Sequence, residues 1–253
     1  MNTVAVIQAR MGSTRFPGKV LADLGGRPML AHVVERVKAS GTVDQVVVAT
    51  TVDPGDDAVA RLAVHMGAAV VRGPVEDVLT RFVAAAREFS ADVVVRITAD
   101  CPLVDPALVD AVVRRRAETG ADYASNVTPP TYPDGYDVEV LTRSCLERLH
   151  RETATRAERE HVTLRVRKHL EEFRTATVRA PLDLSQLRVT VDYPEDLVRV
   201  SHLLAALAPD PMPGFAAVSP LLKIDRGPGG GGAPILAEAA ETAPRRTMTR
   251  ARR

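Results

Sequence analysis

Short apolar runs alternate with helical stripes over the first half of the chain. Runs rich in valine predict β-strands at 4–8, 45–50, 69–71 and 92–98. Apolar residues three and four positions apart predict helices at 28–39, 56–66, 76–89 and 105–119. Because strand, helix and strand repeat in this order, we predict an α/β fold with a doubly wound, mostly parallel sheet flanked by helices.

The second half of the chain is less regular. Prolines and glycine interrupt residues 123–135, and further strands are predicted at 136–141, 175–179 and 187–191. Helices are predicted at 143–152, 156–171 and 194–208. From Pro209 the last 45 residues hold seven prolines and six glycines, a composition typical of disordered segments. We therefore predict a folded domain over 1–208 and a Gly/Pro-rich, largely disordered tail over 209–253 without catalytic residues.

Charge and cysteine content exclude several classes of protein. The 253 residues have a net charge of +1, and the basic excess lies in the predicted tail, with seven Lys or Arg and four Asp or Glu. A near-neutral body argues against a nucleic-acid coat or a membrane-surface protein. The cysteines, Cys101 and Cys145, form no C-x-x-C pair, which excludes a disulfide framework and a zinc knuckle. Without a signal-peptide pattern or an apolar run of about 18 residues, the sequence predicts a cytoplasmic protein.

The first predicted strand leads into a basic segment, ARMGSTRFPGK, residues 9–19, which we name the opening loop. Ligands of doubly wound sheets bind beyond the carboxyl ends of the strands, where this loop lies. Arg10, Arg15 and Lys19 can bind the oxygens of a triphosphate, while glycines let the backbone approach closely. The loop is neither G-x-x-x-x-G-K-[ST] nor G-x-G-x-x-G, which argues against a P-loop NTPase and a dinucleotide fold. The alternative is a solvated basic surface loop.

Two similar phrases place aspartates at the ends of predicted strands. Asp100 follows the strand at 92–98 in Asp-Cys-Pro, and Asp192 follows the strand at 187–191 in Asp-Tyr-Pro. Both carboxylates would lie at the edge of the sheet that carries the opening loop, and two carboxylates with phosphate oxygens suit Mg²⁺. The alternative for Asp192 is a helix cap, because Asp192 and Glu195 have capping-box spacing. We interpret Asp105 as a cap alone.

Six phrases in order resemble one family: VIQARMGSTRFPGKVL, RGPVEDVLTRF, RITADCPLVDP, YPDGYDVEVLTRSCLE, EREHVT and RVTVDYPEDL. They are similar to the SpsF-type cytidylyltransferases of spore-coat polysaccharide biosynthesis, relatives of the CMP-KDO and CMP-sialic acid synthetases. The resemblance covers residues 1–207 and leaves the tail outside. It implies a nucleotide-diphospho-sugar-transferase-like fold, a nucleotidyltransferase domain over 1–208, and a homodimer.

The resemblance also implies roles for individual residues. The nucleotide would contact Ala9, Arg10, Met11, Gly12, Ser13, Arg15, Lys19, Arg72, Gly73, Asp77 and Asp100. The catalytic set would be Arg10, Arg15, Lys19, Asp100 and Asp192, with Asp100 and Asp192 as the metal ligands. The acceptor would contact Tyr132, Asp134, Gly135, Tyr136, Asp137, Arg159 and His161. Without the resemblance, the loop at 132–137 is a plain turn, His161 is a structural histidine, and Cys101 is a buried thiol rather than a nucleophile.

The implied reaction transfers CMP from CTP to an acidic sugar, such as a nonulosonate or a KDO-like acid, and releases pyrophosphate. Mg²⁺, positioning and electrostatics would supply most of the catalysis. The alternatives are a nucleotidyltransferase acting on a sugar phosphate or a phosphonate, and a non-catalytic nucleotide-binding protein of the same fold. Lys19, Asp100 and Asp192 argue against the non-catalytic alternative, because a protein without turnover does not need them.

Overall fold

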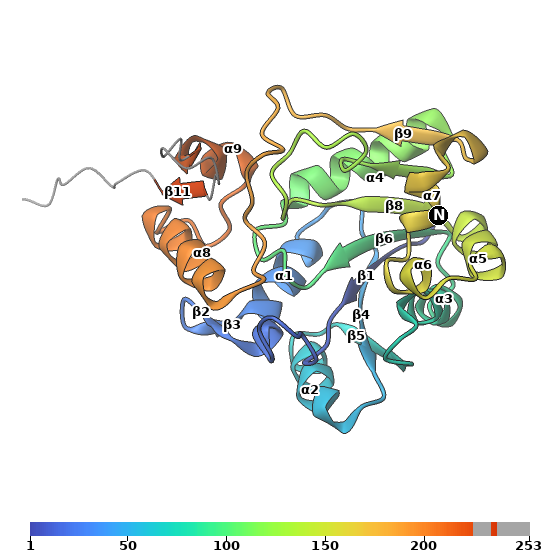
Figure 1. Ribbon diagram of the computed structural model, residues 1–253, viewed down its shortest axis with the longest axis horizontal. Helices are drawn as coiled ribbons and strands as arrows, with labels where there is room; N and C mark the ends of the chain where they lie inside the picture. The colour runs from blue at the N-terminus through green and yellow to red at the C-terminus, as the bar shows by residue number, and fades with distance from the viewer. Residues whose placement is uncertain (225–233, 237–253) are drawn as a thin grey trace, which may run out of the picture.

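The computed structural model describes residues 1–224 and 234–236, and the rest of the predicted tail lies outside the described residues. Seven strands form one sheet in the order β5-β4-β1-β6-β8-β7-β9 (Figure 1). Their bounds are Thr3–Gln8 for β1, Gln45–Thr51 for β4, Ala69–Gly73 for β5, Val93–Thr98 for β6, Tyr123–Ser125 for β7, Glu139–Thr142 for β8 and Thr175–Thr177 for β9.

The strand β1 lies inside the sheet because both of its faces are apolar. Val4 and Val6 are buried against one layer of helices, and Ala5 and Ile7 are buried against the other. β1 pairs in parallel with β4 on one side and with β6 on the other, so the carboxyl ends of these strands share one edge. β8 is antiparallel to β6 and to β7. The sheet is therefore mostly parallel, as the sequence predicts.

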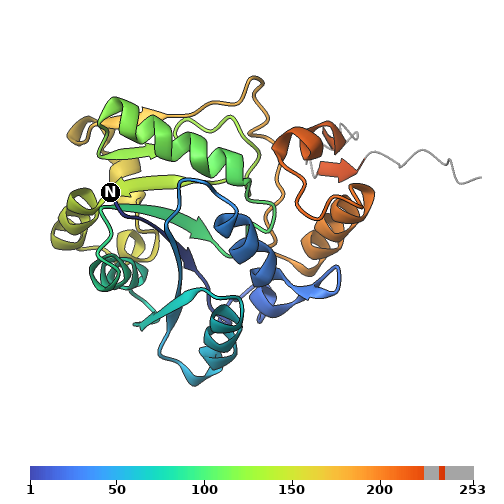
Figure 2. The same cartoon turned by 180° about the vertical axis from the view of Figure 1, so that it is seen from behind.

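Helices cover both faces of the sheet, which confirms the predicted doubly wound arrangement. One core contains side chains of α1 (Met29–Lys38), α2 (Asp57–His65) and α4 (Pro106–Thr119). Figure 2 shows α1 and α4 lying across this face. The other core contains side chains of α3 (Val78–Glu88), α5 (Arg143–Glu152) and α7 (Leu164–Lys168). Each helix contributes the apolar stripe that the 3.6-residue period places on one side.

Short elements connect these layers. They are the 3-10 turns η1 (Lys19–Leu21), η2 (Pro54–Asp56), η3 (Leu170–Glu172) and η4 (Ser219–Leu221), the hairpin of β2 (Asp23–Leu24) and β3 (Arg27–Pro28), the helices α6 (Arg156–Glu160), α8 (Pro194–Ala206) and α9 (Phe215–Val218), and the ribbon of β10 (Leu222–Ile224) and β11 (Pro234–Leu236). In the described part of the chain, no helix has the length and apolar character needed to cross a bilayer.

Most predicted elements differ from the observed ones by a few residues at their ends, and three differ more. The helix at 156–171 is divided into α6 and α7, because Val162 has a φ of 43°, a left-handed conformation that interrupts a helix. The strand at 187–191 is reduced to a single bridge between Asp134 and Arg188. The strand at 136–141 begins only at Glu139. Asp192 therefore follows an extended segment rather than a strand of the sheet.

Packed structure continues beyond the predicted domain boundary at residue 208. Val218 is fully buried in the core that also contains α1. The ring of Phe215 packs edge-on against Tyr132, and its backbone N–H donates to the Asp105 carboxylate at 2.7 Å. The described start of the predicted tail, up to residue 222, is thus packed against the domain.

Candidate active site

The opening loop is shaped by hydrogen bonds to the Met11 carbonyl. The N–H groups of Ser13 and Gly18 both donate to it, at 2.9 Å. Gly18 has a φ of 75°, a left-handed conformation that glycine adopts readily, and it turns the chain into η1. The Asp56 carboxylate accepts the Met11 N–H at 2.7 Å, which ties the loop to η2. The loop so held leads into η1, where Lys19 is buried with only 10% of its side chain exposed.

Lys19 is the centre of the site because its ammonium group contacts both aspartates that the sequence predicts as metal ligands. Its Nζ lies 2.9 Å from Oδ2 of Asp100 and 3.0 Å from Oδ1 of Asp192. It also donates to the Val191 carbonyl at 2.8 Å. Three segments that are distant in the sequence therefore meet at one nitrogen atom.

Charge pairing sets the protonation of this group. Burial by itself disfavours the Asp100 carboxylate, but the Lys19 ammonium and the Thr98 hydroxyl outweigh burial and lower the pKa of Asp100. Burial likewise disfavours the charged lysine, whereas the carboxylates of Asp100 and Asp192 raise the pKa of Lys19. At neutral pH the site therefore presents one ammonium group between two carboxylates.

Asp192 binds cationic side chains and does not cap a helix. Its Oδ1 accepts a hydrogen bond from Arg15 at 2.8 Å, and its Oδ2 accepts one from Arg188 at 3.3 Å. The cap of α8 comes instead from Asp196, whose Oδ2 accepts the backbone N–H of Asp192 at 2.9 Å and that of the following residue at 3.0 Å. The alternative interpretation of Asp192 as a cap is therefore wrong.

Two neighbouring residues have the structural roles that the sequence predicts. Asp105 caps α4 by accepting the Ala107 N–H at 2.8 Å. Cys101 is buried, and burial together with the nearby Asp100 carboxylate raises the pKa of its thiol well above the usual range. A thiol in this state is neutral and unreactive, so Cys101 is a buried thiol.

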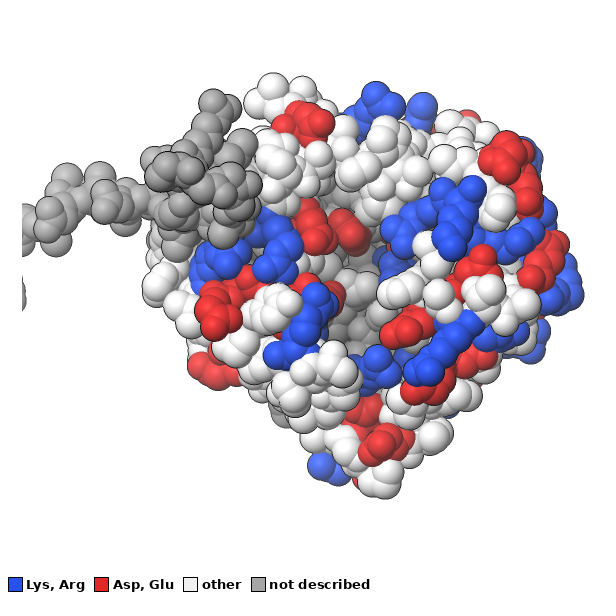
Figure 3. All heavy atoms as spheres, in the orientation of Figure 1, with Lys and Arg blue, Asp and Glu red and all other residues white. Residues whose placement is uncertain are grey.

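A cleft of about 630 Å³ opens beside Lys19 and Asp100 at the carboxyl edge of the sheet. Figure 3 shows this face hollowed near its centre, with basic and acidic side chains around the hollow. Arg156 and Glu160 of α6 contribute to its wall. Of the residues predicted from the sequence, those that line the cleft are Ala9, Arg10, Gly12, Ser13, Arg15, Lys19 and Asp100.

The opening loop keeps two of its cations accessible. Arg10 makes only a loose ion pair with Glu160, at 3.6 Å, and both side chains are partly exposed. The Arg15 side chain is 53% exposed, although its guanidinium contacts Asp192. The Met11 N–H, predicted to bind a phosphate, is already donated to Asp56. Side-chain cations therefore supply most of the positive charge that this loop offers to a ligand.

The residues predicted to close over the base support the adjoining structure. Arg72 donates to the carbonyl of Thr51, the last residue of β4, and to the carbonyl of Asp53 just after it. Asp77 caps α3 and pairs with Arg159 at 2.8 Å. Gly73 permits close packing, because a Cβ atom there would lie 2.8 Å from Cγ of Arg81. The structure does not bring these three residues to the cleft beside Lys19.

The loop predicted for the acceptor lies against the segment that leads to Asp192. The backbone of Asp134 donates to the Leu187 carbonyl and accepts from the Val189 N–H. Partial removal from water and the nearby carboxylates of Asp100 and Asp192 raise the pKa of Asp134. The loop therefore places a carboxyl group close to the two aspartates of the site.

Tyr132 and Tyr136 of this loop have a structural role. Their rings lie 4.9 and 5.1 Å from the Phe215 ring, between centroids, and Tyr136 is fully buried. Both rings pack into the core on the α1 side of the sheet. They anchor the loop and do not line the cleft beside Lys19, and their contact with the acceptor stays a prediction.

We expect Gly135→Ala to lower both stability and activity. Gly135 has a φ of 111°, and an added Cβ would lie 2.8 Å from the Thr190 nitrogen and 2.9 Å from the Val189 carbonyl carbon. Backbone atoms cannot yield as a flexible side chain does, so we expect a loss of about 1–3 kcal/mol in the free energy of unfolding. Thermal unfolding and the initial rate of pyrophosphate release would measure both effects. An alanine variant as stable and as active as the parent would contradict this reading of the loop.

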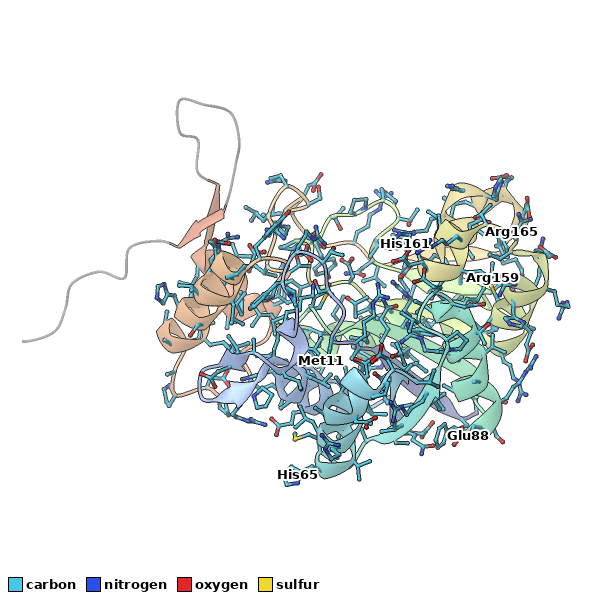
Figure 4. All side chains as sticks on the ribbon, turned by 60° about the horizontal axis from the view of Figure 1, so that its bottom comes forward. Met11, His65, Glu88, Arg159, His161 and Arg165 are labelled. Atoms are coloured by element: carbon cyan, nitrogen blue, oxygen red, sulfur yellow. The ribbon has the colours of Figure 1, made fainter. Side chains whose placement is uncertain are left out.

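Arg159 and His161 lie on the α6 side of the site, apart from Met11 (Figure 4). Arg159 pairs with Asp77. His161 is exposed and lines a pocket of about 120 Å³ together with Arg10. Neither residue contacts Lys19, so the structure leaves their predicted contact with the acceptor as a prediction.

Sequence reasoning missed three residues that hold the site in place. Asp56 orders the opening loop, Arg188 contacts Asp192, and Asp196 binds both Arg188 and the backbone at Asp192. Arg188 and Asp196 could have been noticed in the sequence, because Arg188, Asp192 and Asp196 follow one another at intervals of four residues. For Asp56, the preceding Pro54-Gly55 predicts a turn but no contact with the opening loop.

Comparison with known proteins agrees with this geometry. Residues 4–203 match the family described as cytidylyltransferase. The spore coat polysaccharide biosynthesis protein SpsF of Bacillus subtilis is 36% identical over 205 residues, which cover 78% of this chain and 84% of that protein. A 3-deoxy-manno-octulosonate cytidylyltransferase of Anaeromyxobacter sp. (strain K) is 42% identical over 115 residues, which cover 44% of this chain and 46% of that protein.

A solved structure shares the architecture. The cytidylyltransferase of Leptospira borgpetersenii superposes with a TM-score of 0.79 at 34% identity, over 81% of this chain and 87% of that chain. The family match over residues 4–203 includes Lys19, Asp100 and Asp192. The chain therefore belongs to the cytidylyltransferase family and is a CTP-dependent nucleotidyltransferase.

Proposed function

We propose that the protein transfers CMP from CTP to an acidic sugar, a nonulosonate or a KDO-like acid, and releases pyrophosphate. The observation that carries this proposal is the meeting of Lys19, Asp100 and Asp192 beside a cleft lined by the basic opening loop. The relatives named for SpsF and for 3-deoxy-manno-octulosonate cytidylyltransferase support the class of acceptor.

The opening loop would bind the triphosphate and stabilise the leaving group. An acceptor oxygen attacks the α-phosphorus of CTP, and the bond from that phosphorus to the departing pyrophosphate breaks. Arg10 and Arg15 offer guanidinium groups, which form paired hydrogen bonds with phosphate oxygens. Lys19 adds an ammonium group at the floor of the cleft. Preorganised positive charge of this kind stabilises the negative charge that develops on pyrophosphate.

The aspartates fit a divalent cation. Their oxygens converge on one cationic nitrogen, so the protein already favours positive charge at this point. Mg²⁺ prefers carboxylate and phosphate oxygens and is commonly held by one or two carboxylates together with the phosphates of a substrate. Asp100 and Asp192 would hold Mg²⁺, which, when bound, supplies further charge stabilisation to the reacting phosphates.

We expect CTP to be the preferred nucleotide and a divalent cation to be required. A coupled pyrophosphate assay with the four nucleoside triphosphates, with and without excess chelator, measures both. Equal turnover of ATP and CTP would contradict the proposed nucleotide. Full activity in excess chelator would remove the cation from the mechanism.

The same assay with a panel of acceptors tests the proposed sugar. KDO, a nonulosonate, a sugar 1-phosphate and a phosphonate cover the alternatives that the sequence leaves open. Pyrophosphate release with KDO or the nonulosonate supports the proposal, and release only with the phosphate or phosphonate contradicts it. CTP binding without release for every acceptor would favour a non-catalytic protein. The homodimer implied by the resemblance stays a prediction that light scattering would check.

A further inference from the structure

Asp137 precedes β8, at the edge of the sheet where the cleft opens. β8 pairs antiparallel with β6, with Glu139 opposite Arg96. The pairing ends at this pair, and the antiparallel direction carries the preceding residue Asp137 toward the carboxyl end of β6, where Thr98 and Asp100 line the cleft. The charge of Asp100 acts on Asp137, and Asp137 acts in turn on the Cys101 thiol, so Asp137 is near the residues that follow β6.

The arginine whose charge acts on Asp137, Arg96, is already paired with another carboxylate. Arg96 forms an ion pair with Glu139, and Glu139 also accepts the Tyr123 hydroxyl at 2.6 Å. Among the described residues, no hydrogen bond or ion pair engages the Asp137 carboxyl group. Asp137 is partly buried, so an unpaired carboxylate there is costly. Such a group has the capacity to take up a proton.

The surrounding charges tune that capacity. Burial first, and then the carboxylates of Asp134, Glu139 and Asp100, raise the pKa of Asp137, while Arg96 lowers it; the result is a pKa of about 7. Burial, and then the carboxylates of Asp100 and Asp137, raise the pKa of the Cys101 thiol well above the usual range, so this neighbour is neutral. A catalytic base is most effective when its pKa lies near the operating pH.

We propose that Asp137 is the general base of the reaction and that the acceptor therefore reacts through a hydroxyl group. In this step an oxygen of the Asp137 carboxylate takes the hydroxyl proton as the acceptor oxygen bonds to the α-phosphorus. The bond from that phosphorus to pyrophosphate breaks, and pyrophosphate carries away the electron pair. This inference rests on the proposed function and deepens it.

The inference separates two classes of acceptor by their chemistry. The hydroxyl of a KDO-like acid or a nonulosonate must lose a proton as it attacks phosphorus. The oxygen of a sugar phosphate or a phosphonate is already anionic at neutral pH and needs no base. A carboxyl group poised to accept a proton beside the cleft therefore favours the hydroxyl acceptors.

The test is the pH dependence of kcat/KM for three enzymes with CTP, Mg²⁺ and KDO, or the nonulosonate if that acceptor is faster. For the parent, we expect kcat/KM to rise with pH and to level off above about pH 7, because kcat/KM reports the ionisation of the free enzyme. For Asp137→Asn, we expect a rate about 10²-fold lower at pH 8 and no such rise. For Asp137→Glu, which keeps a carboxylate, we expect partial activity with the rise retained.

A matched control and a second measurement guard against a merely structural effect. The control is Asp92→Asn. Asp92 lies at the opposite end of β6, where its side chain accepts the Asn2 N–H, and its substitution should leave the rate and its pH profile unchanged.

The raised pKa of Asp137 means that the folded parent binds a proton more tightly than the unfolded chain. The part of the stability that Asp137 contributes is therefore full below about pH 4 and is lost as the pH rises toward 7. Asp137→Asn should lack this loss and stay folded.

The results decide the inference separately from the proposed function. The inference is supported if the parent turns over a hydroxyl acceptor and Asp137→Asn loses both this activity and the rise of kcat/KM with pH. Asp137→Asn with at least a third of the parental kcat/KM at pH 8, or with the pH rise intact, overturns the general base and leaves the proposed function standing. An enzyme that uses only the sugar phosphate or the phosphonate overturns both.

Discussion

Lys19→Met is expected to reduce kcat/KM by about 10³-fold, the upper end of the effect of removing one preorganised electrostatic group. The substitution deletes the ammonium group that contacts Asp100, Asp192 and the Val191 carbonyl. It also leaves two carboxylates close together without the cation between them. The coupled pyrophosphate assay at saturating CTP would measure the loss.

The same variant should reverse one component of the pH dependence of stability. In the parent, Lys19 helps hold the folded-state pKa of Asp100 below its unfolded value, so Asp100 stabilises the protein above that unfolded pKa of about 4 and loses this contribution as the pH falls. Without Lys19, burial and Asp192 favour protonated Asp100, and the variant should gain stability as the pH falls from about 7 to about 4. Thermal unfolding at several pH values would show the change of slope.

Lys38→Met is the matched control, because it makes the same exchange on α1. Lys38 is exposed, donates to the Met66 carbonyl and does not line the cleft. We expect its rate and its pH profile of stability to match those of the parent. A Lys19→Met enzyme within tenfold of the parental rate would contradict the central role assigned to this lysine.

Asp192→Asn is expected to lower the rate by about 10²-fold while the melting temperature stays within a few degrees of the parent. Asparagine keeps the size of the side chain but loses the charge that faces Lys19, Arg15 and Arg188. The start of α8 is not affected, because its cap comes from Asp196. Rate and stability should therefore separate in this variant.

Asp105→Asn is the control with the opposite pattern. Asparagine can still accept the Ala107 N–H, so the cap of α4 is kept, but its amide cannot also accept the Phe215 N–H at the second oxygen position. We expect some loss of stability with an unchanged rate.

Normal turnover by Asp192→Asn at saturating CTP and ordinary Mg²⁺ would remove Asp192 from the site and leave Asp100 as the only protein ligand of the cation.

Local sequence pattern is sufficient for the parallel half of the fold. The valine-rich runs that become β1, β4 and β6 are buried on both faces, and the helices between them have one apolar stripe, so their type and order follow from nearby residues. The opening loop and Asp100 follow β1 and β6 directly. Their place at the carboxyl edge could therefore be predicted as soon as the parallel sheet was, and the phosphate-binding role of Arg10, Arg15 and Lys19 is a prediction that follows from this place.

The second half of the site required the tertiary structure. The residues around Asp192 in the sequence are compatible both with a helix cap and with a site residue. The ion pairs of Asp192 with Lys19, Arg15 and Arg188, which only the tertiary structure shows, exclude the cap. The antiparallel pairing of β8 with β6 brings Asp137, which precedes β8, toward the carboxyl end of β6, although about 40 positions separate these segments in the chain. Pairing between distant segments depends on the packing of the whole domain. The sequence by itself thus determined the family, the parallel sheet and the basic loop, because each depends on neighbouring residues. The tertiary structure decided which carboxylates meet the lysine and, within the described part of the chain, left the carboxyl group of Asp137 without a hydrogen bond or an ion pair.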